Sequence, residues 1–115
     1  MVTTRASRTD VFRALADPTR RSILDLLRRG ELPVGSIAER FDTTRPAVSK
    51  HLRILRGALL VRERRDGRLR ICELNTEPLK QVDAWLDEYR RFWSVSLKRL
   101  KRHLEAGVGT RRARD

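Results

Sequence analysis

The chain has 115 residues, enough for one hydrophobic core and one compact domain. Lys and Arg number 27 against 15 Asp and Glu, which gives a formal net charge of +12, and 39% of the residues are hydrophobic. This hydrophobic content argues against a disordered chain. The positive charge favours a polyanionic partner, either nucleic acid or an anionic membrane surface.

Several features indicate a cytoplasmic protein. A single cysteine, Cys72, cannot form an internal disulfide, which is typical of a reducing compartment. Residues 1–10 lack the apolar stretch of a signal peptide. No apolar run approaches the length of about 18 residues that a membrane span needs.

The first half of the chain predicts four short helices. Apolar residues are spaced for one helical face over residues 9–16, and Asp17-Pro18 is typical of an N-cap followed by the first residue of a second helix, which ends at Gly30. A third helix carries Ile37, Ala38 and Phe41. After a tight turn, Thr44 is placed to cap a fourth helix from Arg45 to about Arg56, with Val48, Leu52 and Leu55 facing inward.

The second half predicts a hairpin and a long helix. Segments 59–65 and 68–74 flank Asp66-Gly67, a signal for a two-residue turn. Beyond Pro78 a helix is expected to run to about Glu105, with an apolar ladder of Val82, Leu86, Tyr89, Trp93, Leu97, Leu100 and Leu104. We expect residues 1–8 to be flexible, residues 9–105 to form a single domain, and residues 106–115 to be a disordered basic tail.

These elements predict a mainly α fold with a small β-hairpin, a winged helix-turn-helix, because such a module places one helix in the major groove of DNA. Nine basic residues and two acidic ones lie between Arg45 and Arg70, a net +7 of the total +12. On the fourth helix, Arg45, Ser49, Lys50 and Arg53 lie away from the apolar face. A solvated basic face on an ordinary small domain is the alternative interpretation.

Two segments resemble ArsR/SmtB-type bacterial repressors. Residues 15–24, Leu-Ala-Asp-Pro-Thr-Arg-Arg-Ser-Ile-Leu, are similar to the opening of that family, and residues 45–55, Arg-Pro-Ala-Val-Ser-Lys-His-Leu-Arg-Ile-Leu, are similar to its recognition helix. Residues 62–68 match its wing. The resemblance covers residues 9–105 and implies a homodimer that binds operator DNA and represses transcription. The DNA contacts that it implies are Thr44, Arg45, Pro46, Ser49, Lys50 and Arg53 on the helix and Arg64, Arg65 and Arg68 on the wing.

Individual roles follow from chemistry. Arg45, at the helix start, is expected to reach base edges, where Arg commonly pairs with guanine. The wing arginines are expected to supply salt-dependent contacts to the backbone. His51 either contacts the groove or packs against the protein, and we favour packing.

The long last helix is the expected dimer element, because its apolar ladder exceeds what a small domain needs. In the family the first and last helices form the subunit interface. This implicates Val11, Phe12, Leu15, Trp85, Leu86, Tyr89, Phe92 and Trp93. Alternatively, these side chains cover the monomer's own core.

Many members of the family sense metals, but the ligands are missing here. The segment 31–37, where relatives that bind soft metals place cysteines, has none. On the last helix His103 and Glu105 are two apart and point to different sides, although Asp83 or Asp87 could contribute from a second subunit. We therefore expect no metal and no other cofactor, and Cys72 to be a packing residue.

One departure from the family concerns the junction between recognition helix and wing. Relatives usually have Glu-Ala-Gly-Leu, whereas this chain has Gly57-Ala58-Leu59-Leu60. Leu59 thus occupies the position where glycine suits a left-handed cap. Either the helix ends earlier, at Gly57, or Leu59 is strained.

The function predicted from the sequence is an operator-binding repressor of its own gene, acting without a metal and with an inducer, if any, unknown. No catalytic grouping or phosphate-binding loop is present, so an enzyme is not expected. The alternatives are a metal-responsive repressor of the same family and a basic winged-helix module that binds RNA or a protein. RNA readers usually expose stacking aromatics, whereas aromatic residues make up 5% of this chain, which favours duplex DNA.

Overall fold

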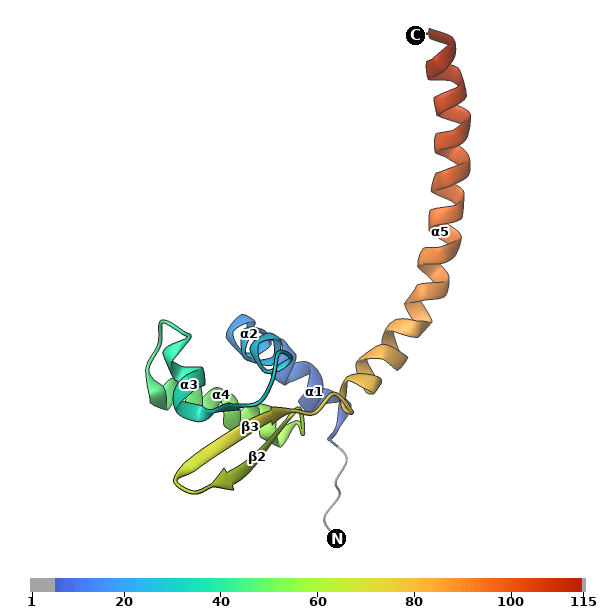
Figure 1. The fold of residues 1–115 in the computed structure, drawn as a ribbon. Helices are drawn as coiled ribbons and strands as arrows, with labels where there is room; N and C mark the ends of the chain where they lie inside the picture. Colours follow the sequence, from blue (N-terminus) through green and yellow to red (C-terminus); the bar gives the residue numbers. More distant parts are fainter. Residues whose placement is uncertain (1–5, 115) are drawn as a thin grey trace. The chain divides into compact units, whose positions relative to one another are not determined.

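The computed structural model describes residues 6–114, with side-chain surroundings for residues 6–107. Its elements in chain order are α1 (Arg8–Leu15), α2 (Pro18–Leu27), β1 (Leu32–Pro33), α3 (Val34–Glu39), α4 (Arg45–Gly57), β2 (Val61–Asp66), β3 (Leu69–Leu74) and α5 (Leu79–Arg114) (Figure 1). They form two compact units that divide between Val82 and Asp83. The first unit holds α1 to β3 and the first turn of α5, and the second holds the rest of α5. No described helix is long and apolar enough to cross a membrane.

The five helices and the hairpin confirm the predicted winged helix-turn-helix, with one strand added. Residues Leu32 and Pro33 form β1, which pairs antiparallel with β3 and gives a three-stranded sheet of order β1-β3-β2. Sequence reasoning missed β1 because it has two residues, too few for any alternation. Pro33 has no N–H to donate and is tolerated because β1 is at the sheet edge.

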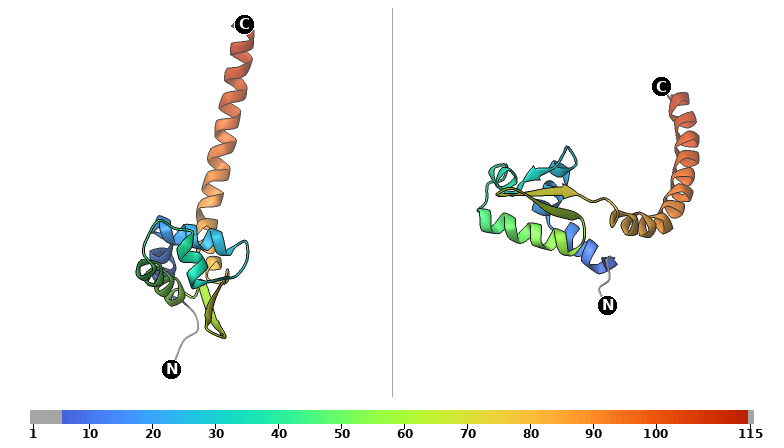
Figure 2. Two further views of the ribbon diagram at one scale, coloured as in Figure 1. Left: turned by 60° about the vertical axis from the view of Figure 1, so that its left-hand side comes forward. Right: turned by 60° about the horizontal axis from the view of Figure 1, so that its bottom comes forward.

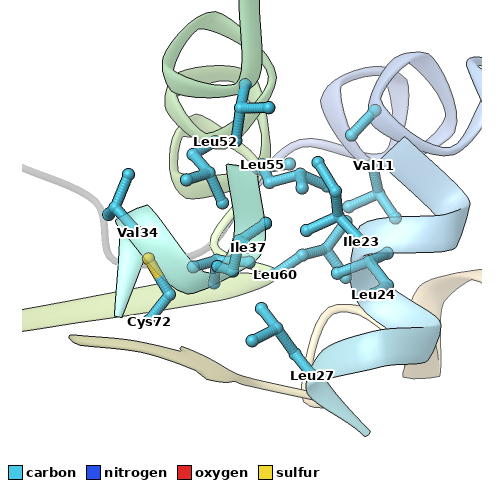
Figure 3. Packing of buried hydrophobic residues seen from close by; sticks show 14 of the residues in the cluster. Val11, Ile23, Leu24, Leu27, Val34, Ile37, Leu52, Leu55, Leu60 and Cys72 are labelled. Atoms are coloured by element: carbon cyan, nitrogen blue, oxygen red, sulfur yellow. The ribbon is translucent and has the colours of Figure 1, made fainter. Parts of the chain in front are cut away.

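The core of the first unit lies between the helices and the sheet. Each helix buries one apolar face: Val11 from α1, Ile23 from α2, Ile37 from α3, and Leu52 and Leu55 from α4 are fully buried. Leu60 and Cys72 close the core from the side of the sheet, as Figure 3 shows. Burial of this kind stabilises the fold by roughly 1.5–3 kcal/mol per large aliphatic side chain. The inward face predicted for α4 is confirmed.

The turn of the wing is shifted by one residue from the expected position. Asp66 pairs with Leu69, so the two turn residues are Gly67 and Arg68 rather than Asp66 and Gly67. Gly67 has a φ of 63°. This suits the first central position of a type II′ turn, which needs positive φ and is reserved for glycine.

The last helix extends further than predicted. It continues to Arg114, whereas an end near Glu105 and a disordered tail over 106–115 were expected. No proline interrupts residues 106–114, so their backbone N–H groups can all bond within the helix. Residues 9–105, which we expected to form a single domain, span both compact units. Of the expected flexible segment 1–8, residues 1–5 lie outside the described residues, as does Asp115.

Candidate nucleic-acid interface

The recognition helix begins with a side-chain cap. Thr44 Oγ1 accepts a hydrogen bond from the backbone N–H of Ala47 at 3.2 Å, and Pro46 follows in the first turn, where its missing N–H has no cost. The helix therefore starts at Arg45 and holds the side chains of its first turn in a defined direction. Thr44, Arg45 and Pro46 are all exposed.

One face of α4 is basic and open. Val48 and Leu52 are fully buried on the inner face, whereas Arg45, Lys50 and Arg53 are exposed and Ser49 is half-buried. Among the described residues, none of these outward side chains forms an ion pair with an acidic side chain. An exposed helix face of this kind can enter a major groove and reach bases or phosphates.

A groove of about 550 Å³ separates the start of α4 from the tip of the wing. Arg45 and Ser49 line it from α4, and Arg68 and Arg70 line it from the hairpin. Residues 33–36 and Glu39 form its floor from the α3 side. The structure thus brings Arg45, Ser49 and Arg68 to one concave surface, and it adds Arg70, which sequence reasoning did not select. The other predicted DNA contacts do not line this groove; they are Thr44, Pro46, Lys50, Arg53, Arg64 and Arg65.

The wing arginines differ in what surrounds them. Arg64 donates two hydrogen bonds to Glu31, from Nη1 to Oε2 at 2.9 Å and from Nη2 to Oε1 at 2.8 Å, and this pairing raises the pKa of its guanidinium. Arg65 and Arg68 are exposed, and Arg68 lies at the turn. The guanidinium of Arg64 is therefore held by the protein's own carboxylate, while Arg65 and Arg68 point their charge to solvent.

An ion network links the recognition helix to the wing. Glu63 on β2 accepts a hydrogen bond from Arg56 of α4, and its Oε1 lies 3.0 Å from Nε of Arg70 on β3, in an ion pair that is not aligned as a hydrogen bond. The Glu63 side chain is 17% exposed, so the pairing is partly shielded from water. One carboxylate thereby joins α4 to both strands of the hairpin. Figure 1 shows α4 next to this hairpin.

The junction between α4 and the wing answers the question that the sequence left open. The helix ends early, at Gly57, and Leu59 has a φ of 60°, in the left-handed region. The early helix end and the strained Leu59, given above as alternatives, therefore occur together. The N–H of Leu60 bonds to the carbonyl of Leu55 at 3.0 Å and that of Leu59 to Arg56 at 2.9 Å. This is the Schellman pattern of a helix end, with leucine where glycine is usual.

Asn75, which directly follows β3, stabilises this junction. Its Nδ2 donates to the carbonyl oxygen of Leu59 at 2.7 Å, and its backbone N–H donates to the carbonyl oxygen of Leu60 at 2.8 Å. A left-handed leucine costs on the order of 1 kcal/mol, which these bonds and the burial of Leu60 offset. Sequence reasoning missed Asn75, whose only signal is its position directly after the hairpin.

The inner side of α4 is tied to α1 and α2 by one arginine. Arg20 donates from Nε to the carbonyl of Ala14 at 2.8 Å and from Nη2 to that of Arg13 at 3.0 Å, satisfying the C-terminal end of α1. Its Nη1 lies 3.3 Å from Nδ1 of His51, a half-buried residue of α4. The packing role favoured for His51 is therefore the one that the structure shows.

The expected dimer residues lie in both units. In the first unit Val11 is fully buried in the chain's own core, and Phe12 and Leu15 are half-buried. In the second, Trp85 and Leu86 are half-buried, while Tyr89, Phe92 and Trp93 are 43%, 67% and 49% exposed. The rings of Trp85 and Tyr89 lie 5.0 Å apart, and those of Tyr89 and Trp93 lie 6.5 Å apart. Val11 is buried and therefore cannot contact a second subunit directly, whereas the exposed aromatic side chains of α5 can.

Metal ligands do not gather in the part of the chain that the structure describes. No group of three His, Cys, Asp or Glu side chains among these residues is placed to hold an ion. Cys72 is fully buried, and its burial, together with the nearby Glu63 carboxylate, raises the pKa of its thiol to about 11. A thiol in this state is neutral at pH 7 and a poor ligand for metal ions.

The fold and the basic groove define a class of DNA-binding winged helix-turn-helix proteins, and comparisons with known proteins agree. Residues 15–64 match the model of a helix-turn-helix domain family. The chain is 43% identical over 77 residues to the transcriptional repressor SdpR of Bacillus subtilis, covering 67% of this chain and 86% of that protein. It is 42% identical over 86 residues to the HTH-type transcriptional regulator Rv2034 of Mycobacterium tuberculosis, covering 75% and 78%. A crystal structure of an ArsR family transcriptional regulator, 40% identical, superposes with a TM-score of 0.69 over 75% of this chain and 89% of that one.

The chain belongs to the ArsR/SmtB family of transcriptional regulators. Like these relatives, it is a DNA-binding transcriptional repressor. It is not an enzyme.

Proposed function

We propose that the protein represses its own gene by binding a palindromic operator as a homodimer in the cytoplasm, without a metal. The observation that carries the proposal is the groove lined by Arg45 and Ser49 of α4 and Arg68 of the wing. A base-reading side chain and a phosphate-binding one on the same concave surface suit recognition of duplex DNA. Two such surfaces related by a twofold axis match a palindrome.

The residues on the proposed DNA face divide into two kinds. Arg45, Ser49, Lys50 and Arg53 follow one face of α4, where we assign base reading and nearby phosphates, with Thr44 and Pro46 at its start. Arg65 and Arg68 supply contacts to the backbone of flanking DNA. Arg64 is a weaker candidate than these because Glu31 already holds its guanidinium.

Independence from metals is supported by the side chains that the structure places. Some relatives are named for arsenic, such as the arsenical resistance operon repressor of Staphylococcus xylosus, which is 36% identical to this chain over 77 residues. In this chain the only cysteine is a buried neutral thiol, and the described His and acidic side chains do not converge. Because these ligands are not brought together, we rank a metal-responsive repressor of the same family second, after a metal-independent one.

The test is a titration of the purified protein against labelled duplex from its own upstream region and against a scrambled duplex. It is run at low and moderate salt, with a chelator and with added Zn²⁺ or arsenite. Binding of two chains to the upstream duplex that survives moderate salt and is indifferent to chelator and metal supports the proposal. Release of the operator by either metal would establish the second candidate. Equal, salt-sensitive binding to both duplexes would contradict a specific repressor and direct the search to RNA or protein partners.

A further inference from the structure

Positive charge is concentrated in a second part of the chain, the C-terminal half of α5. Residues 94–114 include seven basic residues and one acidic residue, a net charge of +6 against +12 for the whole chain. They lie in the second compact unit, where α5 continues as one helix to Arg114 (Figure 2), whereas the basic residues of α4 and the wing lie in the first. The proposed operator contacts therefore do not account for this second concentration of charge.

Most of the basic side chains described in this half of α5 have no carboxylate beside them. Earlier in the same helix, by contrast, Arg90 bonds to Asp83 and lies 3.7 Å from Asp87. The four described bases after Trp93 are all exposed, and one of them, Lys101, lies 4.0 Å from Glu105. The other three form no ion pair or side-chain hydrogen bond with any described residue; they are Lys98, Arg99 and Arg102.

The three unpaired bases share one side of the helix. Leu97, Leu100 and Leu104 follow one another at spacings of three and four residues, so they form an exposed apolar stripe. With about 3.6 residues per turn, the side opposite this stripe carries the unpaired bases, which we call the basic face: Lys98, Arg99 and Arg102. A second subunit that covered the leucines, as in the proposed homodimer, would leave the basic face open.

The stability of the helix does not explain the basic face. Basic residues interact favourably with the helix dipole only in the last turn, whereas Arg99 lies about four turns before the end of α5 at Arg114. Lys98 and Arg102 are four residues apart, a spacing at which like charges destabilise a helix. An anionic partner would relieve this repulsion, so the arrangement favours binding over a structural role.

We propose that the basic face binds the phosphate backbone of duplex DNA, independently of base sequence. Guanidinium groups suit phosphates because they donate two parallel hydrogen bonds, and contacts to phosphates carry no sequence information. Duplex DNA is the polyanion that the first unit binds, and four residues connect β3 to α5. DNA held by α4 is therefore present at high local concentration for the bases of the same chain. The inference rests on the proposed function and adds to it an affinity that needs no operator.

A salt series on the full chain tests this proposal. The three bases of the basic face are replaced together by Gln, and binding to a scrambled duplex and to the operator duplex is followed by fluorescence anisotropy. The slope of log K against log salt should fall by about three for each bound chain, because about 0.9 counterions are released per phosphate contact. Affinity at low salt should fall about tenfold or more, and by the same factor on both duplexes, so that the preference for the operator is unchanged.

Two further variants separate a DNA contact from other effects of the substitutions. The matched control removes the same charge from exposed side chains of the first unit, as Arg8→Gln, Arg28→Gln and Arg29→Gln together, and should keep the wild-type slope. The charge-preserving variant Lys98→Arg, Arg99→Lys and Arg102→Lys should also keep it. Gln, Lys and Arg have similar helix propensities, so circular dichroism should show the same helix content in all of these proteins.

Each outcome decides for or against the basic face. An unchanged slope in its Gln variant would overturn the proposal, and an equal loss in the first-unit control would reduce the effect to net charge. The same variants are also sedimented with vesicles of equal parts phosphatidylcholine and phosphatidylglycerol. Loss of vesicle binding with full DNA binding would overturn the proposal in favour of a membrane surface. A wild-type chain with no preference for the operator would contradict the proposed function, whereas the scrambled duplex would still test the basic face.

Discussion

Asn75 fixes the backbone of Leu59, one residue past the cap of the recognition helix, through a 2.7 Å hydrogen bond from Nδ2 to the Leu59 carbonyl oxygen. Leu59 is the one described residue other than glycine with positive φ. The segment that sets the direction of the wing relative to α4 therefore depends on a side chain that follows the hairpin in sequence.

Replacing Asn75 by Ala should lower the free energy of unfolding by about 1–3 kcal/mol, because the half-buried Leu59 carbonyl loses its donor. Urea denaturation followed by circular dichroism measures this loss. The exposed neighbour Thr76→Ala is the control and should change stability by less than about 0.5 kcal/mol. Equal stability of both variants would show that the Schellman bonds hold the junction without Asn75.

Replacing Glu63 by Ala should destabilise the protein by about 1–3 kcal/mol, because Arg56 and Arg70 lose the carboxylate that they share. Glu73→Ala, on the neighbouring strand and exposed, removes the same charge and serves as the matched variant. The Glu63 change should also reduce the preference for operator over scrambled duplex more than the Glu73 change does. If Glu63→Ala and Glu73→Ala have the same stability and the same increase in affinity for scrambled duplex, the ion network has no structural role and the effect is one of surface charge alone.

Arg45→Ala and Arg68→Ala should weaken DNA binding in different ways. If Arg45 reads a base, its loss should cost about 1–3 kcal/mol on the operator and less on scrambled duplex. Loss of Arg68 should weaken binding to both duplexes and reduce the slope of log K against log salt by about one. Fluorescence anisotropy over a salt series distinguishes the two, and equal losses on both DNAs for Arg45→Ala would make it a phosphate contact.

Arg64→Ala should weaken DNA binding less than Arg68→Ala, because Glu31 holds the Arg64 guanidinium through two hydrogen bonds. The pair is about half exposed, so the interaction energy from a double-mutant cycle with Glu31→Ala should not exceed about 1 kcal/mol. A DNA-binding defect of Arg64→Ala as large as that of Arg68→Ala would show that the ion pair opens when the wing meets DNA.

Cys72 makes stability sensitive to alkaline pH. Its thiol has a pKa raised from 9.0 to about 11 by burial, so the folded state favours the protonated form. This contribution is fully present below pH 9 and is lost as pH rises through 11, by on the order of 2 kcal/mol. Cys72→Ala should show a flatter profile of unfolding free energy between pH 8 and pH 11. Rapid alkylation of the folded wild-type thiol at pH 8 would contradict the assigned burial.

The sequence predicted the helices because their caps and apolar spacing are local. Asp17, Thr44 and the buried face of α4 follow from rules that span a few residues, and the structure has them where expected. The same reasoning could not find contacts between distant segments. Glu31 and Arg64 are 33 residues apart, and Asn75 and Leu59 are 16 apart, so no local spacing rule pairs them.

The turn of the wing is a local element that sequence reasoning misjudged. Asp66-Gly67 is a common type I′ pair, but the strands pair with Asp66 opposite Leu69, which places the turn at Gly67-Arg68. Both turns keep Cys72 on the same face of the hairpin, so the alternation of apolar residues could not distinguish them. The observed turn places Arg68 in the turn itself, at the tip of the wing.

The contacts of Arg20 affect what similarity to relatives can mean. Its guanidinium bonds to carbonyls of α1 and faces His51, and Asp17 caps α2 by accepting from the Arg20 N–H at 3.0 Å. These residues, prominent in the segment that resembles the family, act inside the protein and hold its helices together. Agreement in this segment therefore transfers architecture between proteins but carries no information about the DNA sequence that each one binds. For that, two relatives have to be compared at Arg45, Ser49, Lys50 and Arg53, where a protein with the same framework can choose a different operator.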